Sequence, residues 1–304
     1  MRGQTRSQSM TKKRRQPGVE AREQLGWWHA HRFLLLRRAT QLLVLALFLA
    51  GPVAGLWLLK GNLSSSELLG TVPLTDPLLL LQSVSAGHWP LSTLWWGALI
   101  VLVSYWLVGG RVFCSWICPV NLITDAAAWL RARLGLRDVS TLVRSTRYWL
   151  LAMVLALPAV TGVLVWEWVN PVPLLLRGLL FGMGAGWALL LALFVFDLLV
   201  AARGWCGHLC PVGAFWALVN RLGFIKVTAS GRARCNQCMD CYAVCPEPQI
   251  LKGPLLGARR GHGPLISAQE CLNCGRCIDV CAQQVFTLSV GFAVKADNIS
   301  EKQQ

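Results

Sequence analysis

Four long apolar stretches constrain this chain more than any other feature. They cover residues 39–59, 91–110, 148–166 and 178–202, and Asp197 is the one charged residue among them. A helix needs about 20 apolar residues to cross a bilayer core of about 30 Å. Lipid offers no hydrogen bonds to the backbone, so helix is the expected conformation. The stretches therefore predict an α-helical membrane protein with four transmembrane helices. A composition of 55% hydrophobic and 14% charged residues agrees with this prediction.

The basic residues lie on one side of the predicted spans. All but two of the 29 Lys and Arg residues fall before residue 39, in the loop 111–147, or after residue 202. The exceptions are Lys60 and Arg177. Cytoplasmic loops carry the excess of Lys and Arg, so both termini are expected on the cytoplasmic side of a bacterial inner membrane. The net charge of +15 is then a signal of topology, and no nucleic-acid motif accompanies it.

The sequence divides into three regions. Residues 1–38 are polar and basic, and we expect a disordered cytoplasmic arm. Residues 39–220 are expected to form the four-helix transmembrane domain, and residues 221–304 a small cytoplasmic α+β domain. The first apolar stretch is longer than the core of a signal peptide and lacks a following A-x-A site, so we expect it to be retained.

The transmembrane domain contains an internal repeat. Each half has a helix, an outer loop with Asp76-Pro77 or Asn170-Pro171, a second helix and a Cys-x3-Cys-Pro motif. Two spans in each half make the repeats parallel. Membrane proteins built from repeats place functional groups where the repeats meet.

The repeated motif supplies four cysteines, Cys114, Cys118, Cys206 and Cys210. On a helix, positions i and i+4 share a face, so each pair presents two sulfurs together. The four thiols are a candidate redox or metal site between the halves: a dithiol–disulfide, a bound metal or a set of cluster ligands. The alternative is that they only pack, because free cysteine behaves as a small hydrophobic residue.

Eight further cysteines follow in two copies of one motif. Each copy is Cys-x2-Cys-x2-Cys-x3-Cys, the spacing of bacterial ferredoxins that hold two [4Fe–4S] clusters. In such domains the fourth cysteine of each copy binds the other cluster. The expected ligands are Cys235, Cys238, Cys241 and Cys281 for cluster 1, and Cys271, Cys274, Cys277 and Cys245 for cluster 2. Zinc is the alternative, but it usually takes paired Cys-x2-Cys units with a longer gap.

Two other residues are weaker candidates. Asp197 is an ionisable residue inside a predicted span, and such residues default to functional candidates. It lies near the cytoplasmic end, so its carboxylate could also simply reach water. His208 lies between Cys206 and Cys210, but the first copy has Trp116 there, which favours an ordinary interfacial histidine.

The combination of four spans, two Cys-x3-Cys-Pro motifs and two tandem ferredoxin motifs resembles the NapH family. The resemblance covers about residues 30–290, and the stretch from Cys235 to Pro248 is particularly similar. Members of this family are ferredoxin-type quinol dehydrogenase membrane subunits of periplasmic nitrate reductase systems. Related maturation proteins of nitrous-oxide reductase and cytochrome oxidase usually carry extra domains, and a methylamine-utilisation relative is of similar size.

The resemblance implies a quinol-oxidising electron-transfer subunit. Its substrate would be quinol from the quinone pool, its cofactors two [4Fe–4S] clusters, and its partners a periplasmic iron–sulfur subunit and nitrate reductase. Two other functions stay open. The protein could be a factor that reduces a metal or thiol during metalloenzyme maturation, or an anchoring subunit whose clusters mainly stabilise its fold.

Overall fold

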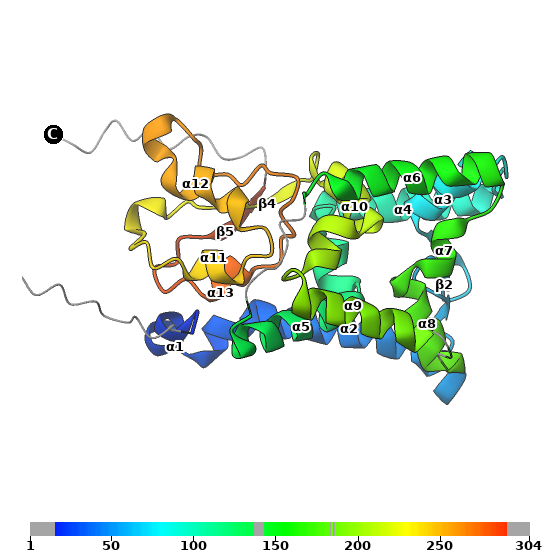
Figure 1. Cartoon of the computed structure of the whole chain (residues 1–304), viewed down its shortest axis with the longest axis horizontal. Coiled ribbons are helices and arrows are strands. Elements are labelled where there is room, and N and C mark those ends of the chain that lie inside the picture. The colour runs from blue at the N-terminus through cyan, green and yellow to red at the C-terminus, as the bar shows by residue number, and fades with distance from the viewer. Residues whose placement is uncertain (1–15, 137–142, 183, 185, 291–304) are drawn as a thin grey trace, which may run out of the picture.

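The computed structural model describes residues 16–136, 143–182, 184 and 186–290, which form a helical part and a smaller C-terminal part (Figure 1). The α-helices of the helical part are α1 (Val19–Leu25), α2 (Trp27–Ala54), α3 (Pro77–Ser85), α4 (Ser92–Val108), α5 (Val120–Leu134), α6 (Thr146–Thr161), α7 (Val165–Val169), α8 (Pro171–Phe181), α9 (Gly186–Leu199) and α10 (Pro211–Asn220). Two π-helical turns, η1 (Phe113–Ile117) and η2 (Trp205–Leu209), precede α5 and α10.

Helix α2 is long and apolar enough to cross a membrane, judged by length and composition. It begins at Trp27, well before the expected position 39, because the chain turns into it at Gly26 with φ 86°. It ends before Gly55, whose left-handed backbone donates its N–H to the Gly51 carbonyl at 2.9 Å. The arm expected for residues 1–38 is therefore helical from Val19, apart from Gly26, and residues 1–15 lie outside the described part.

The other expected spans are shorter than the sequence suggested. Helix α4 falls inside the second apolar stretch, and α6 overlaps the third but begins two residues before it. Within the described residues, α2 alone meets the length criterion for a membrane span. The fourth stretch, 178–202, is not one helix. It contains the end of α8 and all of α9, because Gly182 (φ 81°) and Gly184 (φ 45°) break the helix between them.

The two sequence halves interleave in space. Helices α3 and α4 of the first half pack with α6 and α10 of the second, and α2 and α5 of the first half pack with α8 and α9 of the second. Figure 1 shows these two groups as an upper and a lower layer. Neither half is therefore a separate bundle, and each layer needs elements from both.

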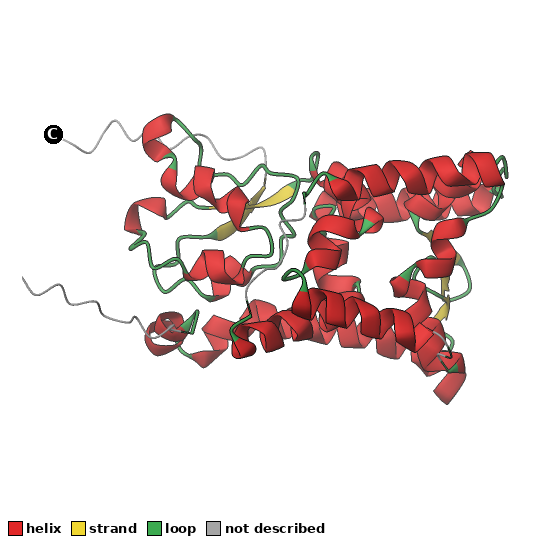
Figure 2. Ribbon diagram, in the orientation of Figure 1, coloured by secondary structure: helices red, strands yellow, loops and turns green. Residues whose placement is uncertain are grey.

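The end remote from the C-terminal part holds structure that the sequence analysis did not anticipate. Strands β1 (Leu59–Gly61), β2 (Ser65–Leu68) and β3 (Val72–Thr75) form an antiparallel sheet between α2 and α3 (Figure 2). The Asp-Pro and Asn-Pro pairs begin helices there. The Asp76 side chain accepts the Leu78 N–H at 3.0 Å, and Asn170 caps α8 in the same way. Proline suits the first helical position because its missing N–H would be unpaired anyway.

The C-terminal part is small and contains all eight ferredoxin-type cysteines. Its strands β4 (Ile225–Thr228) and β5 (Thr287–Val290) pair in antiparallel fashion, and its short α-helices are α11 (Asp240–Val244), α12 (Lys252–Leu256) and α13 (Arg276–Asp279). Ile266, Ile278 and Phe286 form part of a buried apolar core around the cysteines.

Two glycines in the turn after α4 let α10 and the C-terminal part approach it closely. A Cβ at Gly110 would lie 2.6 Å from the backbone N of Asn220 and 2.6 Å from the Trp216 carbonyl oxygen. Gly109 has φ 110°, and a Cβ there would overlap the Asn273 amide. That amide donates to the Ile225 carbonyl at 2.8 Å. The turn after α4 thus fits directly against the C-terminal part.

We expect Gly109→Ala to destabilise the protein more than Gly135→Ala. Both residues have positive φ, but a Cβ at Gly135 would meet nothing within 4 Å. The shared left-handed strain costs about 1–2 kcal/mol, and overlap at Gly109 should add about 1–3 kcal/mol. Denaturant unfolding of the purified holoprotein, followed by tryptophan fluorescence, measures both losses. Equal losses of unfolding free energy in the two variants would show that the close approach at Gly109 does not contribute to stability.

Candidate metal centres

Each expected set of four cysteines lines its own cavity in the C-terminal part. Cys235, Cys238, Cys241 and Cys281 line the first, which is walled by residues such as Leu255. Cys245, Cys271, Cys274 and Cys277 line the second, which is walled by residues such as Ile266. The grouping is the crossed one, in which each set takes three cysteines from one motif and one from the other. All twelve cysteines are free thiols.

The backbone of the two cysteine loops follows the same unusual path. Gln237 (φ 57°) and Met239 (φ 67°) flank Cys238, and Asn273 (φ 47°) and Gly275 (φ 71°) flank Cys274. A non-glycine residue in this region costs about 1–2 kcal/mol and persists where the surroundings demand it. The path turns three sulfurs of each motif towards one cavity, as a cluster held by four thiolates requires.

The donor sets suit clusters better than single ions. Among the residues that the structure describes, no three His, Cys, Asp or Glu side chains come together as a site for one metal ion. A four-iron cluster binds each thiolate on a different iron and so accepts a wider set. The residues present therefore fit [4Fe–4S] clusters.

The second set lies against the helical part. The Ser115 hydroxyl in η1 donates to the Leu272 carbonyl at 2.9 Å, and the Trp116 indole N–H donates to the Asn273 carbonyl at 3.2 Å. Asn220, at the end of α10, donates to the Cys271 carbonyl at 2.9 Å. The loop of the second set is thus bonded directly to the segments that carry or follow the Cys-x3-Cys-Pro motifs. In the first set, by contrast, Cys238 is exposed.

Positive charge surrounds the second set. Arg37, Arg203 and Arg276 all act electrostatically on Cys274, and Arg111 acts on Cys271. Arg37 is 1% exposed, and its Nε and Nη1 have no hydrogen-bond partner within the described chain. These positive charges suit a negatively charged cluster at this position.

Both Cys-x3-Cys-Pro motifs form π-helical turns instead of the α-helix assumed from their spacing. The Cys118 N–H bonds to the Phe113 carbonyl at 2.9 Å, and the Cys210 N–H bonds to the Trp205 carbonyl at 2.9 Å. The two turns are equivalent in the two halves. Such turns are rare and occur frequently at functional sites.

The four thiols of these turns lie within electrostatic range of one another. Cys206 is influenced by Cys210, Cys118 and Cys114, and Cys118 by Cys114 and Cys210. Burial raises the pKa of all four thiols above the ordinary value, to about 12 for Cys210. They are neutral thiols at pH 7 unless a metal or a disulfide bond removes their protons.

The two weaker candidates have different surroundings. Asp197 is fully buried, and one carboxylate oxygen accepts the Trp205 N–H at 2.9 Å, so it supports the start of η2. His208 lies near Glu247, and burial lowers its pKa. Neither residue joins the four thiols or the eight ferredoxin-type cysteines in one set of donors among the described residues.

A buried carboxylate, Glu247, connects the C-terminal part to the helices. Its Oε1 accepts Arg147 Nη1 at 3.0 Å and Arg111 Nη1 at 3.5 Å, and its Oε2 accepts Arg144 Nε at 2.9 Å. Burial alone would raise the pKa of Glu247, but these guanidinium groups and Gln249 hold it below its usual value. Since Glu247 lies two residues after Cys245, this cluster fixes one ligand of the second set.

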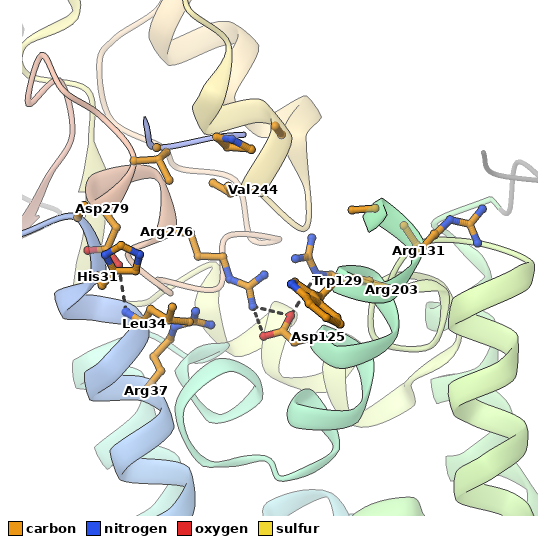
Figure 3. Close-up of a pocket in the computed structure, with 18 of the residues that line it drawn as sticks. His31, Leu34, Arg37, Asp125, Trp129, Arg131, Arg203, Val244, Arg276 and Asp279 are labelled. Carbon is orange, nitrogen blue, oxygen red and sulfur yellow. Dashed lines mark hydrogen bonds and ion pairs between the residues drawn. The ribbon is translucent and has the colours of Figure 1, made fainter. Parts of the chain in front are cut away.

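A second buried carboxylate, Asp125 on α5, also connects the C-terminal part to the helices (Figure 3). It accepts Arg276 Nη2 at 2.6 Å, Arg38 Nη2 at 2.6 Å and Arg203 Nε at 3.3 Å. Burial would raise the pKa of Asp125, but the three guanidinium groups lower it. Arg276 precedes Cys277, so this cluster too reaches the second set.

The sequence analysis missed both carboxylate–arginine clusters. One signal was present, because Arg111 and Arg203 begin the two repeated motifs at equivalent positions. The acidic partners gave no such signal. Asp125 is in α5 and Glu247 is far along the chain, and only the fold brings them to these arginines.

Iron–sulfur family models match the segments that contain all twelve cysteines. Residues 234–285 match a family model described as a 4Fe-4S dicluster domain, and residues 90–137 and 180–228 match two copies of a model described as a 4Fe-4S binding domain. The fold and these matches define a ferredoxin-type iron–sulfur electron-transport protein. No solved structure matches the chain.

Curated relatives give the family. The ferredoxin-type protein NapH of Escherichia coli is 51% identical over 92% of this chain and 97% of its own length, and that of Haemophilus influenzae is 50% identical over 90% and 96%. The methylamine utilization ferredoxin-type protein MauN of Methylorubrum extorquens is 45% identical over 91% and 94%. The chain belongs to the NapH family, as the sequence motifs predicted.

We expect Glu247→Gln to destabilise the protein strongly. Removing one partner of a buried ion pair costs about 3–5 kcal/mol, because the remaining charges stay buried. The lowered pKa of Glu247 means that its stabilisation is present above the ordinary value of 4.5 and is lost as pH falls through the lower folded value. Thermal unfolding of the holoprotein at pH 7 measures the loss.

The matched control is Glu23→Gln, which removes an exposed carboxylate on α1. Surface changes of this kind stay within about 0.5 kcal/mol. If both variants unfold at the same temperature, Glu247 does not hold the two parts together.

Proposed function

We propose that this protein is an inner-membrane electron-transfer subunit that oxidises quinol. Electrons would pass through two [4Fe–4S] clusters towards a periplasmic nitrate reductase, through an iron–sulfur partner. The observation that supports this most is the placement of the cysteines. Two four-cysteine cavities lie in one small domain, and the loop of the second is hydrogen-bonded to η1, which carries Cys114.

The proposed topology has four crossings, α2, α4, α6 and α9, with α3 and α8 as short additional helices. The basic residues support cytoplasmic termini and a cytoplasmic cluster domain over residues 221–304. The transmembrane domain would cover residues 39–220 together with the earlier residues of α2 from Trp27.

Each cluster has a proposed ligand set. Cys235, Cys238, Cys241 and Cys281 would hold cluster 1, and Cys271, Cys274, Cys277 and Cys245 would hold cluster 2. The clusters supply one-electron transfer when bound. These residues would hold cluster 2 against the helices and among arginines, and Cys238 of the first set is exposed.

Two observations keep a second function in view. MauN relatives are about as similar in length as the NapH relatives and are named for methylamine utilization. The four thiols of η1 and η2 lie near one another, and a factor that reduces a metal or thiol during metalloenzyme maturation would use such a group of thiols. Quinol-dependent reduction of the clusters separates the first proposal from these, because maturation of another protein does not require quinol as the donor.

The anaerobically purified protein is expected to hold about eight iron and eight sulfide per chain, since each cluster has four of each. Cys238→Ser should lower the iron content to about half by removing a ligand of cluster 1. Leu256→Ser, at the wall of the same cavity, should keep the full content. Zinc without sulfide in the native protein would contradict the proposal.

The four thiols of η1 and η2 provide the functional test. If they form one site, Cys118→Ala and Cys210→Ala should each abolish quinol-dependent cluster reduction in membranes, and the double variant should lose little more. Groups that act as a unit show this non-additivity. The iron content should stay unchanged if the eight C-terminal cysteines hold both clusters. If both single variants reduce their clusters normally, the thiols only pack.

A further inference from the structure

A cavity of about 200 Å³ lies in the helical part, apart from the eight ferredoxin-type cysteines. It lies between α2 and α4 and is bounded by the β1–β3 sheet at one end and by η1 and α10 at the other. The lining is mostly apolar or aromatic and includes Val44, Thr75, Asp76, Tyr105, Phe113 and Trp216. Pockets of this kind bind small ligands through a few well-placed polar groups.

The polar groups at the sheet end are not fully used by the protein. Asp76 accepts the Leu78 N–H through Oδ1, and Oδ2 takes no part in that bond. The Thr75 hydroxyl is 2% exposed and has no hydrogen-bond partner within the described residues. A buried hydroxyl without a hydrogen-bond partner is costly. A ligand oxygen at this end of the cavity would give the Thr75 hydroxyl a partner.

Tyr105 lies at the other end, between the sheet and the thiols. Its ring packs edge-on against Trp216 at 4.8 Å and Phe113 at 5.8 Å between centroids. Asp76, Cys114 and Cys118 all lie within its electrostatic range. The cavity therefore extends from a carboxylate to the neighbourhood of one Cys-x3-Cys-Pro pair.

The second half of the repeat has a different chemistry at the equivalent positions. Asn170 replaces Asp76 as the helix cap, and Asp197 stands where the first half has Tyr105. The carboxylate of Asp197 is engaged by the Trp205 N–H. Trp166 stacks on Trp205, the equivalent of Phe113. The carboxylate–tyrosine pair is thus a specific property of the first half and not a requirement of the fold.

The lining suits a ligand with a flat apolar ring and an oxygen at the ring edge. We infer that the cavity is the binding site for the quinol ring, with Asp76 accepting a hydrogen bond from a ring hydroxyl and the aromatic side chains holding the ring faces. This inference rests on the proposed quinol oxidation and adds the place where quinol binds.

The state of Asp76 agrees with this role. Its pKa is raised to about 7, chiefly by burial, with the Leu78 N–H opposing this rise and the nearby Glu167 carboxylate adding to it. A carboxyl group with this pKa exists in both forms near neutral pH. It can therefore accept a hydrogen bond from a hydroxyl or donate one to a carbonyl.

The test is photolabelling of the full-length holoprotein in lipid nanodiscs. The probes are short-tailed azidoquinones, one benzoquinone and one naphthoquinone, competed by the unlabelled quinone. Label is expected in peptides that contain Asp76, Tyr105 or Phe113. In Asp76→Asn, at least tenfold more unlabelled quinone should be needed to suppress the labelling. This variant should still fold, because Asn170 shows that asparagine caps the equivalent helix. Val44→Phe, which fills the cavity without touching a polar group, should raise the required quinone concentration similarly.

Glu67→Gln is the control, since it removes an exposed carboxylate from strand β2 of the same sheet. The concentration of unlabelled quinone that suppresses its labelling should be within twofold of that for the unmodified protein. Saturable labelling elsewhere, or unchanged competition in Asp76→Asn and Val44→Phe, would overturn this inference and leave quinol oxidation standing. No saturable labelling of the unmodified protein would overturn both.

Discussion

Two buried carboxylates hold this protein together. Glu247 and Asp125 each bind three arginines, and each cluster joins the C-terminal part to the helices. Charges taken out of water in this way are costly unless every partner is present. The arrangement therefore permits one docking position, in which Ser115 and Trp116 also reach the loop of the second cysteine set. The position of that set relative to η1 and η2 follows from this electrostatic constraint.

The interleaved halves explain why the thiols of the two repeats lie near one another. Each π-helical turn follows a helix of one layer and leads into a helix of the other, since α4 precedes α5 and α9 precedes α10. Arg111 and Arg203, the first residues of the two motifs, bind Glu247 and Asp125 respectively. The duplication of the motif thus supplies both thiol pairs and the two arginines that take part in the carboxylate clusters. The first half then differs by having Asp76 and Tyr105 around a cavity.

The sequence predicted whatever depends on local spacing. The crossed grouping of the eight cysteines follows from the ferredoxin motif, and the apolar stretches predicted α4 and α6 closely. Features that depend on the fold were missed. The π-helical form of the motifs, the break at Gly182 and the β1–β3 sheet have no periodic signal. Glu247 and Asp125 look like ordinary charged residues until distant arginines surround them.

The interleaving also constrains how the chain can be made. A chain leaving the ribosome completes α2, α3, α4 and α5 before any partner from the second half exists. Because α5 packs on α8 and α9, and α3 packs on α6, both layers remain incomplete until α9 and α10 have been synthesised. Domains usually fold from the N-terminus during synthesis, but here the helices of the first half must wait for their packing partners from the second half. The C-terminal part is synthesised last. It can dock only after both layers have assembled and positioned Arg111 and Arg203.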